Sequence, residues 1–236
     1  MEWVLLVTLV APAALASRAW VERKPRLGLI IWFASFLSAG LATLAAILIS
    51  VLVAFSAWFA MNSQPLGSTH WLMALGISFL PWIFLALGGI GLALVNHRLS
   101  PLFESASEIH DGLGNLVSHS DSFSGYPVAY VELPVKFAFT GKLRGKQHIV
   151  ISRGVISALA SEEIEAVLWH ELGHIKRRHN ALKKVASLAY SLAPFIKASA
   201  IFVAQVELLC EIEADLFALT KVSNEVLNSA HRSFGF

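Results

Sequence analysis

The sequence has little charge and almost no cysteine. Charged residues make up 14% of its 236 residues, against about 25% in an ordinary soluble domain, and 56% are hydrophobic, which excludes a disordered or collagen-like chain. The single cysteine, Cys210, excludes an internal disulfide and a zinc site built on paired cysteines, and it suits a reducing compartment. The formal net charge of only +2 lacks the strongly basic character of nucleic-acid-binding proteins, so we expect no nucleic-acid partner.

A long stretch of the chain has no charged side chain. No Asp, Glu, Lys or Arg occurs between Arg26 and Arg98, which is typical of a chain that crosses a lipid bilayer. A polar segment at 62–70 divides this stretch into two parts, and each is longer than the roughly 20 residues that cross a hydrocarbon core. We therefore predict membrane spans near 30–59 and 71–95.

The first apolar segment, Trp3 to Ala16, has two interpretations. It is short and ends in Ala-Leu-Ala, which imitates the cleavage site of a signal peptide. However, its amino end carries Glu2 and no cation, and four cations follow it: Arg18, Arg23, Lys24 and Arg26. These cations oppose export of the next stretch, so we predict a retained first span with the following loop in the cytoplasm. Residues 1–98 are then a three-span transmembrane region of a multi-pass cell-membrane protein, and residues 99–236 face the cytoplasm.

The remainder, residues 99–236, has the composition of a globular domain. The stretch 100–126 predicts a helix followed by a loop, and apolar runs at 128–133, 136–143 and 148–152 predict the strands of a small antiparallel sheet. Ser161 is predicted to cap a helix, because Glu162 and Glu163 lie in its first turn and helical apolar periodicity follows through Ile175. The predicted fold class is a mainly α membrane protein, with a transmembrane helical bundle and an α+β domain.

The predicted helix contains the run His170-Glu171-Leu172-Gly173-His174. Two histidines four residues apart project from one helix face, so their imidazoles can share one metal ion, and Glu171 can reach a water molecule on that metal. The geometry suits a hydrolytic zinc site. His179 lies off the stripe that His170 and His174 form, so we do not expect it to bind the metal. We expect it, with Arg177 and Arg178, on a solvated or lipid-headgroup face.

A carboxylate further along the chain can complete the ligand set. Catalytic zinc usually keeps three protein ligands, and Glu211 is our predicted third ligand, with one Zn²⁺ per chain. Asp215 lies one helical turn later and can accept a hydrogen bond from a ligand imidazole. Glu207 and Glu213 are the rival ligands, and either of them can instead be a solvated helix charge.

The segment at 185–205 is apolar apart from Lys197, and Pro194 interrupts its helical pattern. One complete membrane crossing here would place Glu211 on the opposite side from the two histidines. The metal site can close only if the chain returns to the same side. We therefore expect a bent or re-entrant helical pair at the inner face of the membrane.

Together, the His-Glu-Leu-Gly-His run and the later Glu-x-x-x-Asp resemble the integral-membrane gluzincin metallopeptidases, which include the HtpX and CAAX prenyl protease group and the BlaR/MecR group. Three features make the chain most similar to compact BlaR/MecR-like peptidases: three spans before the catalytic domain, the run 126–130, and the run 148–154 that leads into 161–174. The segment 210–215 is also similar to the third-ligand segment of that group. This resemblance implies a zincin-like α+β domain in which His170, His174 and Glu211 bind zinc. It also implies that Glu171 is the general base and then the acid, and that Asp215 orients His170. The strand that would pair with an extended substrate comprises His148, Ile149, Val150, Ile151 and Ser152.

Two expectations concern the end of the chain. No further span or sensor domain follows Asp215, in contrast to the antibiotic receptors of this group, so direct β-lactam sensing is not expected. An oxyanion-stabilising donor is also needed, and the candidates beyond Asp215 are Lys221, His231 and Arg232. We name His231 as the candidate, although a histidine in this position can also be simply solvated.

The predicted function is a membrane-embedded zinc metalloendopeptidase. It would hydrolyse peptide bonds of a regulatory or membrane-associated protein at the cytoplasmic face, with water on the zinc, activated by Glu171, as the nucleophile. The alternatives are a non-catalytic zinc-binding sensor or interaction module, and an HtpX-like protease for membrane-protein quality control. The expected partners are a protein or peptide substrate and the lipid bilayer. The glycines of the run 88–91 would let helices approach closely, which leaves a homo-oligomer open.

Overall fold

The computed structural model describes residues 21, 23–62, 83, 91, 116–143, 145–192 and 197–234. They belong to two compact units, one within 1–19 and 27–98 and the other within 20–26 and 99–236, and each is considered by itself. The predicted span at 3–16 lies outside the described residues, as does the helix expected after Ser100. The predicted span at 71–95 also lies outside them, except for residues 83 and 91. The three-span arrangement therefore stays a prediction.

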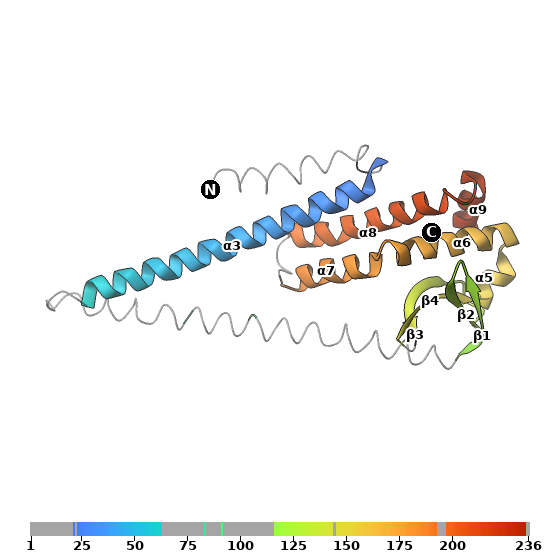
Figure 1. Ribbon diagram of the computed structural model, residues 1–236, viewed down its shortest axis with the longest axis horizontal. Helices are drawn as coiled ribbons and strands as arrows, with labels where there is room; N and C mark the ends of the chain where they lie inside the picture. Colours follow the sequence, from blue (N-terminus) through green and yellow to red (C-terminus); the bar gives the residue numbers. More distant parts are fainter. Residues whose placement is uncertain are drawn as a thin grey trace. The chain divides into compact units, whose positions relative to one another are not determined.

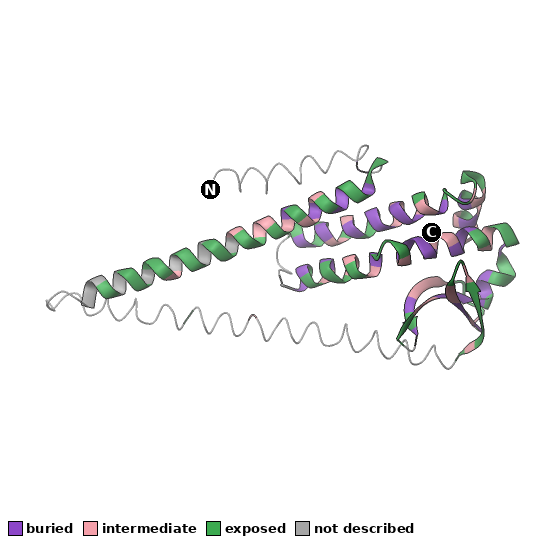
Figure 2. Cartoon of the chain, in the orientation of Figure 1, coloured by how far each residue is buried: buried purple, intermediate pink, exposed green. Residues whose placement is uncertain are grey.

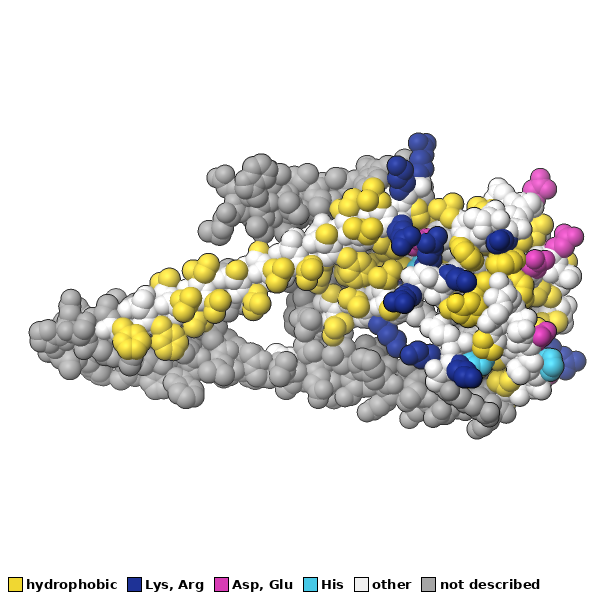
Figure 3. All heavy atoms as spheres, viewed as in Figure 1, with side chains coloured by type: hydrophobic (Ala, Val, Ile, Leu, Met, Phe, Trp, Pro, Cys, Tyr) yellow, Lys and Arg dark blue, Asp and Glu magenta, His cyan; other side chains and the backbone are white. Residues whose placement is uncertain are grey.

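The first unit contains the long helix α3, Pro25–Asn62, which begins in the second unit and covers the span predicted at 30–59. It carries apolar side chains around its whole circumference and no charge after Arg26. Figure 3 shows hydrophobic side chains along its length. In the described part of the chain, α3 is the one helix long and apolar enough to cross a membrane.

The second unit contains a four-stranded sheet (Figure 1) with the order β1-β2-β4-β3. Its strands are β1, Val117–Phe123; β2, Tyr126–Val131; β3, Ala138–Leu143; and β4, Lys146–Ser152. Ser124 and Gly125 form the β1–β2 turn with φ of 50° and 82°, the positive values of a type I′ hairpin. The expectation of a helix followed by a loop up to residue 126 is therefore wrong for residues 117–123, which form β1.

The sheet is mixed rather than antiparallel, because β2 and β4 are parallel. After β2 the chain passes to the far side of β4 before it forms β3. Gly154 N donates to Leu133 O at 3.0 Å along this path, and a Cβ on Gly154 would overlap the carbonyl oxygen of Pro134. As a result β4 lies between β2 and β3. Its residues 149–152 pair with β2, and its residues 146–151 pair with β3. The prediction that His148 to Ser152 pair with a substrate backbone is corrected, because both edges of β4 are occupied.

The core follows the two-residue alternation of the central strands. Val128, Ile149 and Ile151 belong to one buried cluster together with residues of α6, Ser161–Lys176. Ala129 and Val150 belong to a second cluster on the opposite face of the sheet. Because the strands are buried on both faces, they form a rigid base on which α6 rests.

Four further helices complete this unit: α5, Arg153–Ala158; α7, His179–Leu192; α8, Lys197–Ala218; and α9, Asn224–Phe234. Ser161 is not the cap of α6, because the N-cap is Ala160, whose N–H donates to the Glu163 carboxylate at 2.9 Å. Helices α7 and α8 lie side by side (Figure 1), so the chain returns toward α6. Such a return is what a metal site shared by α6 and α8 needs. Figure 2 shows buried positions recurring along α6, α7 and α8.

Helices α6 and α8 approach each other closely at Gly173. A Cβ at this position would lie 3.2 Å from Ala214 Cα and 3.2 Å from a ring carbon of Phe217. Such distances are tighter than ordinary van der Waals contact, so Gly173 and Ala214 permit this approach because both are small. The glycine in the His-Glu-Leu-Gly-His run therefore has a packing role between the two helices.

Gly173→Val is expected to destabilise the domain, because the new side chain would meet backbone atoms of α8. Overpacking of this kind costs about 1–3 kcal/mol. Thermal unfolding of the full-length protein in detergent measures the effect. Gly40→Val on α3 is the matched control, since nothing lies within 4 Å of a Cβ placed there. An equal loss of stability in both variants would contradict this account of Gly173.

Candidate metal centre

The three predicted ligands lie together. His170 and His174 project from one face of α6, and Glu211 reaches them from α8. The Nε2 atoms of the two histidines are 3.1 Å apart. Glu211 Oε2 lies 3.3 Å from Nε2 of His170 and 3.5 Å from Nε2 of His174.

The size of this triangle fits a tetrahedral zinc ion. Bonds of about 2.0–2.1 Å at the tetrahedral angle place neighbouring donor atoms about 3.3–3.4 Å apart. The observed separations of 3.1, 3.3 and 3.5 Å fall around that value. Two imidazole nitrogens and one carboxylate oxygen suit zinc and leave a fourth position free for water or substrate.

Asp215 holds His170 in the required orientation. Its Oδ1 lies 2.7 Å from Nδ1 of His170, so Nε2 faces the other two ligands. Burial disfavours a charge on His170, but the hydrogen bonds to Asp215 and Glu211 outweigh it and raise the pKa of His170 to about 9. The same surroundings that favour a proton here also favour a bound cation.

Glu211 is held by a cation on its other side. Lys183 Nζ donates to Glu211 Oε1 at 2.8 Å, which leaves Oε2 directed at the histidines. Burial raises the pKa of Glu211, but its hydrogen bonds with His170, His174 and Lys183 together hold that pKa well below its usual range. The carboxylate is therefore ionised, as a metal ligand must be.

Glu171 is buried beside the triangle, with only 7% of its surface exposed. Burial raises the pKa of Glu171 to about 7, which suits a group that takes and returns a proton near neutral pH. Glu171 lines a pocket of about 320 Å³ together with His170, Glu211 and Asp215. The other lining residues are Val167, Leu227, Ala230, His231 and Phe234.

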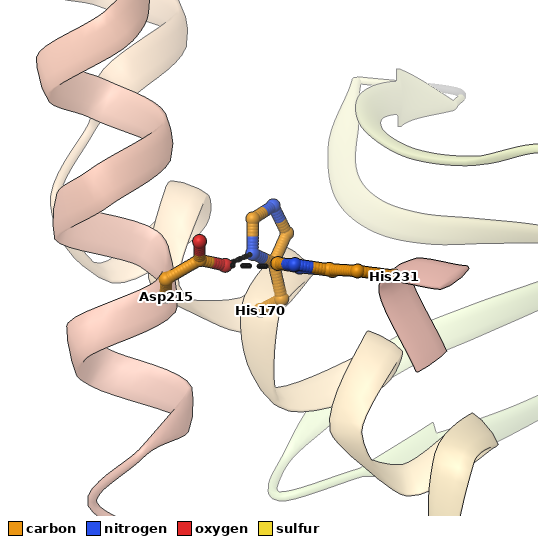
Figure 4. A group of neighbouring side chains, drawn as sticks. All are labelled: His170, Asp215 and His231. Atoms are coloured by element: carbon orange, nitrogen blue, oxygen red, sulfur yellow. Dashed lines mark hydrogen bonds and ion pairs between the residues drawn. The ribbon is translucent and has the colours of Figure 1, made fainter. Parts of the chain in front are cut away.

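His231 also lines this pocket, from α9. Its Nε2 lies 3.3 Å from the Asp215 oxygen that contacts His170, so one carboxylate oxygen serves both rings. Figure 4 shows the three side chains converging from different helices. They do not enclose a second metal ion, because the 2.7 Å between His170 and Asp215 is a hydrogen-bond distance and two donors of one metal lie farther apart.

Three contacts at this site were not predicted from the sequence. His179 is completely buried, which corrects the expectation that it lies on a solvated face. Its Nδ1 lies 2.9 Å from Nδ1 of His174, and its Nε2 lies 3.2 Å from Glu213 Oε2. The third contact is the one between Lys183 and Glu211. Of the rival ligands, Glu213 contacts His179 and Arg177, and Glu207 is exposed.

Comparison with known proteins places the domain in a family. The model of peptidase family M48 matches residues 106–234, which include all the residues of the triangle. The protease HtpX homologue of Methanothermobacter thermautotrophicus is 28% identical over 133 residues, which cover 51% of this chain and 51% of that relative. The protease HtpX homologue 2 of Methanosarcina mazei is 40% identical over 70 residues, covering 29% of this chain and 24% of the relative.

A third relative, the protease HtpX homologue 2 of Methanosarcina acetivorans, is 34% identical over 92 residues, covering 39% of this chain and 31% of the relative. The chain thus spans about half or less of the length of these relatives. The matches confirm the relationship to HtpX-type peptidases that the paired motifs indicated. The closer similarity to the BlaR/MecR group stays a prediction.

We expect the purified protein to hold one zinc ion per chain and Glu211→Ala to lose it. The loss should exceed the roughly 10–100-fold weakening that follows from removing an outer partner of a ligand, because a donor atom itself is removed. Metal analysis after dialysis and competition with a chromophoric chelator measure both. Glu207→Ala is the matched control, since Glu207 lies on the same helix one turn earlier and is exposed. Equal zinc affinity in the two variants would exclude Glu211 as a ligand.

Proposed function

Because the chain belongs to peptidase family M48, we propose that it is a zinc-dependent endopeptidase in which His170, His174 and Glu211 hold the metal. The observation that carries this proposal is the donor triangle with sides of 3.1, 3.3 and 3.5 Å. A buried carboxylate, Glu171, lies beside it in the same pocket. A metal-binding module without turnover would not need that carboxylate, so Glu171 favours the enzyme over the sensor.

The chain's own residues supply the proton transfers. Bound zinc would lower the pKa of a water molecule toward about 7 and polarise the scissile carbonyl. Glu171 accepts the proton of the attacking water on its carboxylate, and it then delivers that proton to the leaving nitrogen of the cleaved peptide bond. Burial raises the pKa of Glu171 from its usual value, which favours the protonated form that the second transfer starts from.

His231 is the proposed donor to the negative charge that develops on the carbonyl oxygen. It lies on the pocket wall, and its contact with Asp215 orients the ring. The rival Arg232 is exposed and does not line the pocket. A donor fixed in advance of the reaction stabilises the transition state without a reorganisation cost.

The pocket and the sheet suggest how a substrate is held. Val167, Leu227 and Phe234 give the pocket an apolar wall, so we expect an apolar side chain next to the cleaved bond. An extended substrate can pair only with an outer strand. Of the two outer strands, β3 has the more extensive contact with α6, which β1 reaches through the ring contact of Phe123 with Trp169. Asn180 already donates to the carbonyl of Thr140 on that strand at 3.1 Å, which limits the pairing to the rest of the edge.

The proposed setting is the cell membrane, with the catalytic domain on the cytoplasmic face. The apolar helix α3 and the charge-free stretch up to Arg98 support membrane spans, and Arg23, Lys24 and Arg26 at the amino end of α3 favour the cytoplasm for that end. In the view of Figure 3, many Lys and Arg side chains of the second unit form a band, and most of the visible Asp and Glu side chains lie apart from it. Such a band suits anionic lipid headgroups. Membrane association of 185–205 and a homo-oligomer stay predictions.

The substrate is proposed to be a regulatory or membrane-associated protein. The alternative, quality control of damaged membrane proteins, predicts a different outcome in cells. Membranes that contain Glu171→Ala should accumulate one or a few proteins if the protease is regulatory. They should accumulate many damaged membrane proteins if it serves quality control.

Glu171→Gln is expected to keep the zinc and lose turnover by at least about 100-fold, because the amide cannot accept the proton. Cleavage of a fluorogenic peptide library by the full-length protein, together with metal analysis, measures both properties. Glu162→Gln, an exposed carboxylate in the first turn of the same helix, serves as the control. Cleavage at the wild-type rate by the zinc-loaded Glu171→Gln protein would exclude Glu171 as the base.

His231→Ala is expected to lower kcat by about 100–1,000-fold with little change in KM, because the donor acts on charge that develops only in the transition state. Steady-state kinetics on one cleaved peptide separates the two constants. Arg232→Ala, at the neighbouring exposed position, should keep the wild-type kcat. If the Arg232 variant lost activity and the His231 variant did not, the assignment would be reversed.

A further inference from the structure

A second imidazole lies directly behind His174. The rings of His174 and His179 have centroids 4.9 Å apart and planes at 82°, and their Nδ1 atoms are 2.9 Å apart. On its other side, Nε2 of His179 lies 3.2 Å from Glu213 Oε2. The second oxygen of Glu213 lies 3.4 Å from Nε of Arg177. These four side chains form a continuous chain of polar contacts that leads away from the metal centre.

The donors and acceptors in this chain can be assigned in one way when His174 binds the metal, as the proposed function requires. Nε2 of His174 then carries the metal, so its hydrogen lies on Nδ1 and is donated to Nδ1 of His179. Nδ1 of His179 must therefore be an acceptor, which places the hydrogen of this ring on Nε2. That hydrogen is donated to Glu213, and Arg177 forms an ion pair with the other carboxylate oxygen.

We propose that His179 and Glu213 are positioning residues for zinc binding, which fix the tautomer and the ring orientation of His174. The two histidine ligands of the metal centre are then held by different kinds of partner. His170 is held directly by a carboxylate, Asp215, whereas His174 is held by a carboxylate acting through a neutral imidazole. Outer partners of metal ligands typically raise metal affinity or activity by about 10–100-fold.

Burial makes the His179 contact irreplaceable by solvent. His179 is 0% exposed, His174 is 6% exposed and Glu213 is 8% exposed. A water molecule has little access to Nδ1 of His174 if His179 is removed, so that N–H would lose its acceptor in a buried place. The Asp215 side chain is 31% exposed, and solvent can partly substitute for it. We therefore expect His174 to depend on its outer partner more strongly than His170 does.

The local backbone explains why His179 reaches His174. In a continuous helix, residues five apart point about 140° away from each other. Here α6 ends at Lys176, and Arg178 has a left-handed φ of 57°, so the chain turns before α7 begins at His179. The turn directs the His179 ring back onto His174. Glu213, two residues after Glu211 on α8, contacts His179, which is the imidazole farther from the metal centre. Glu211 contacts His174, the imidazole at the metal centre.

The test compares zinc affinity among variants of the full-length protein in detergent. His179→Leu removes the acceptor, and we expect its zinc dissociation constant, from competition with a chromophoric chelator, to rise by about 10–100-fold. His179→Asn places a side-chain oxygen close to where Nδ1 was, so it should recover most of the affinity. Glu213→Leu removes the acceptor of His179 from the other helix and should also weaken binding. His119→Leu, an exposed histidine on β1, is the control.

The rescue by asparagine separates positioning from packing, because Asn fills the cavity less well than Leu and yet should bind zinc more tightly. The Co²⁺ absorption spectrum adds a second readout, since a rotated His174 changes the ligand field. Equal zinc affinity in wild type and His179→Leu, or Asn no better than Leu, would overturn the inference. If His179→Leu fails to fold, His179→Asn with wild-type affinity and Glu213→Leu with weakened affinity support it, and unchanged affinity in Glu213→Leu overturns it. A wild-type protein without zinc affinity would refute the proposed function itself.

Discussion

The close contact between α6 and α8 determines whether this protein has a metal centre. The two histidines belong to one helix and the carboxylate to the other, so the donor triangle exists only where the helices nearly touch. Gly173 and Ala214 provide that contact, with only 3.2 Å available for a Cβ. The sheet supports α6 from the other side, and α7 contacts α8. The sheet, α6, α7 and α8 thus together fix the distance between the two imidazoles and the Glu211 carboxylate.

Charge is distributed so that the centre attracts a cation. Glu211 and Asp215 contact the two histidines, and Glu213 contacts His179 behind His174. Lys183 and Arg177 form ion pairs with Glu211 and Glu213 from the outside. The shifted pKa values follow from this arrangement, because it stabilises positive charge at His170 and negative charge at Glu211. Glu171 differs from the other carboxylates, since burial keeps its pKa near 7 and leaves it free to exchange a proton.

The parts of the site that follow from local spacing could be predicted from the sequence. His170 and His174 share a helix face, and Glu211 and Asp215 lie one turn apart, so bringing these four side chains together needs only the helices and one long-range contact. The partners set by tertiary turns could not be predicted. The geometry of a continuous helix turns His179 away from His174, but the left-handed Arg178 interrupts that helix and brings the two rings together. In the sheet, the runs that form β2, β3 and β4 were recognisable, but the position of β4 between β2 and β3 depends on a crossing that no periodicity encodes.

The most direct test of the metal centre is X-ray absorption at the zinc edge of the purified, full-length protein. We predict one zinc ion with two imidazole nitrogens and a carboxylate oxygen, at distances of about 2.0–2.2 Å, and one further light atom. A spectrum with no imidazole scattering, with one imidazole, or with a sulfur ligand from Cys210 would contradict the claim that the two helices meet around a single metal ion.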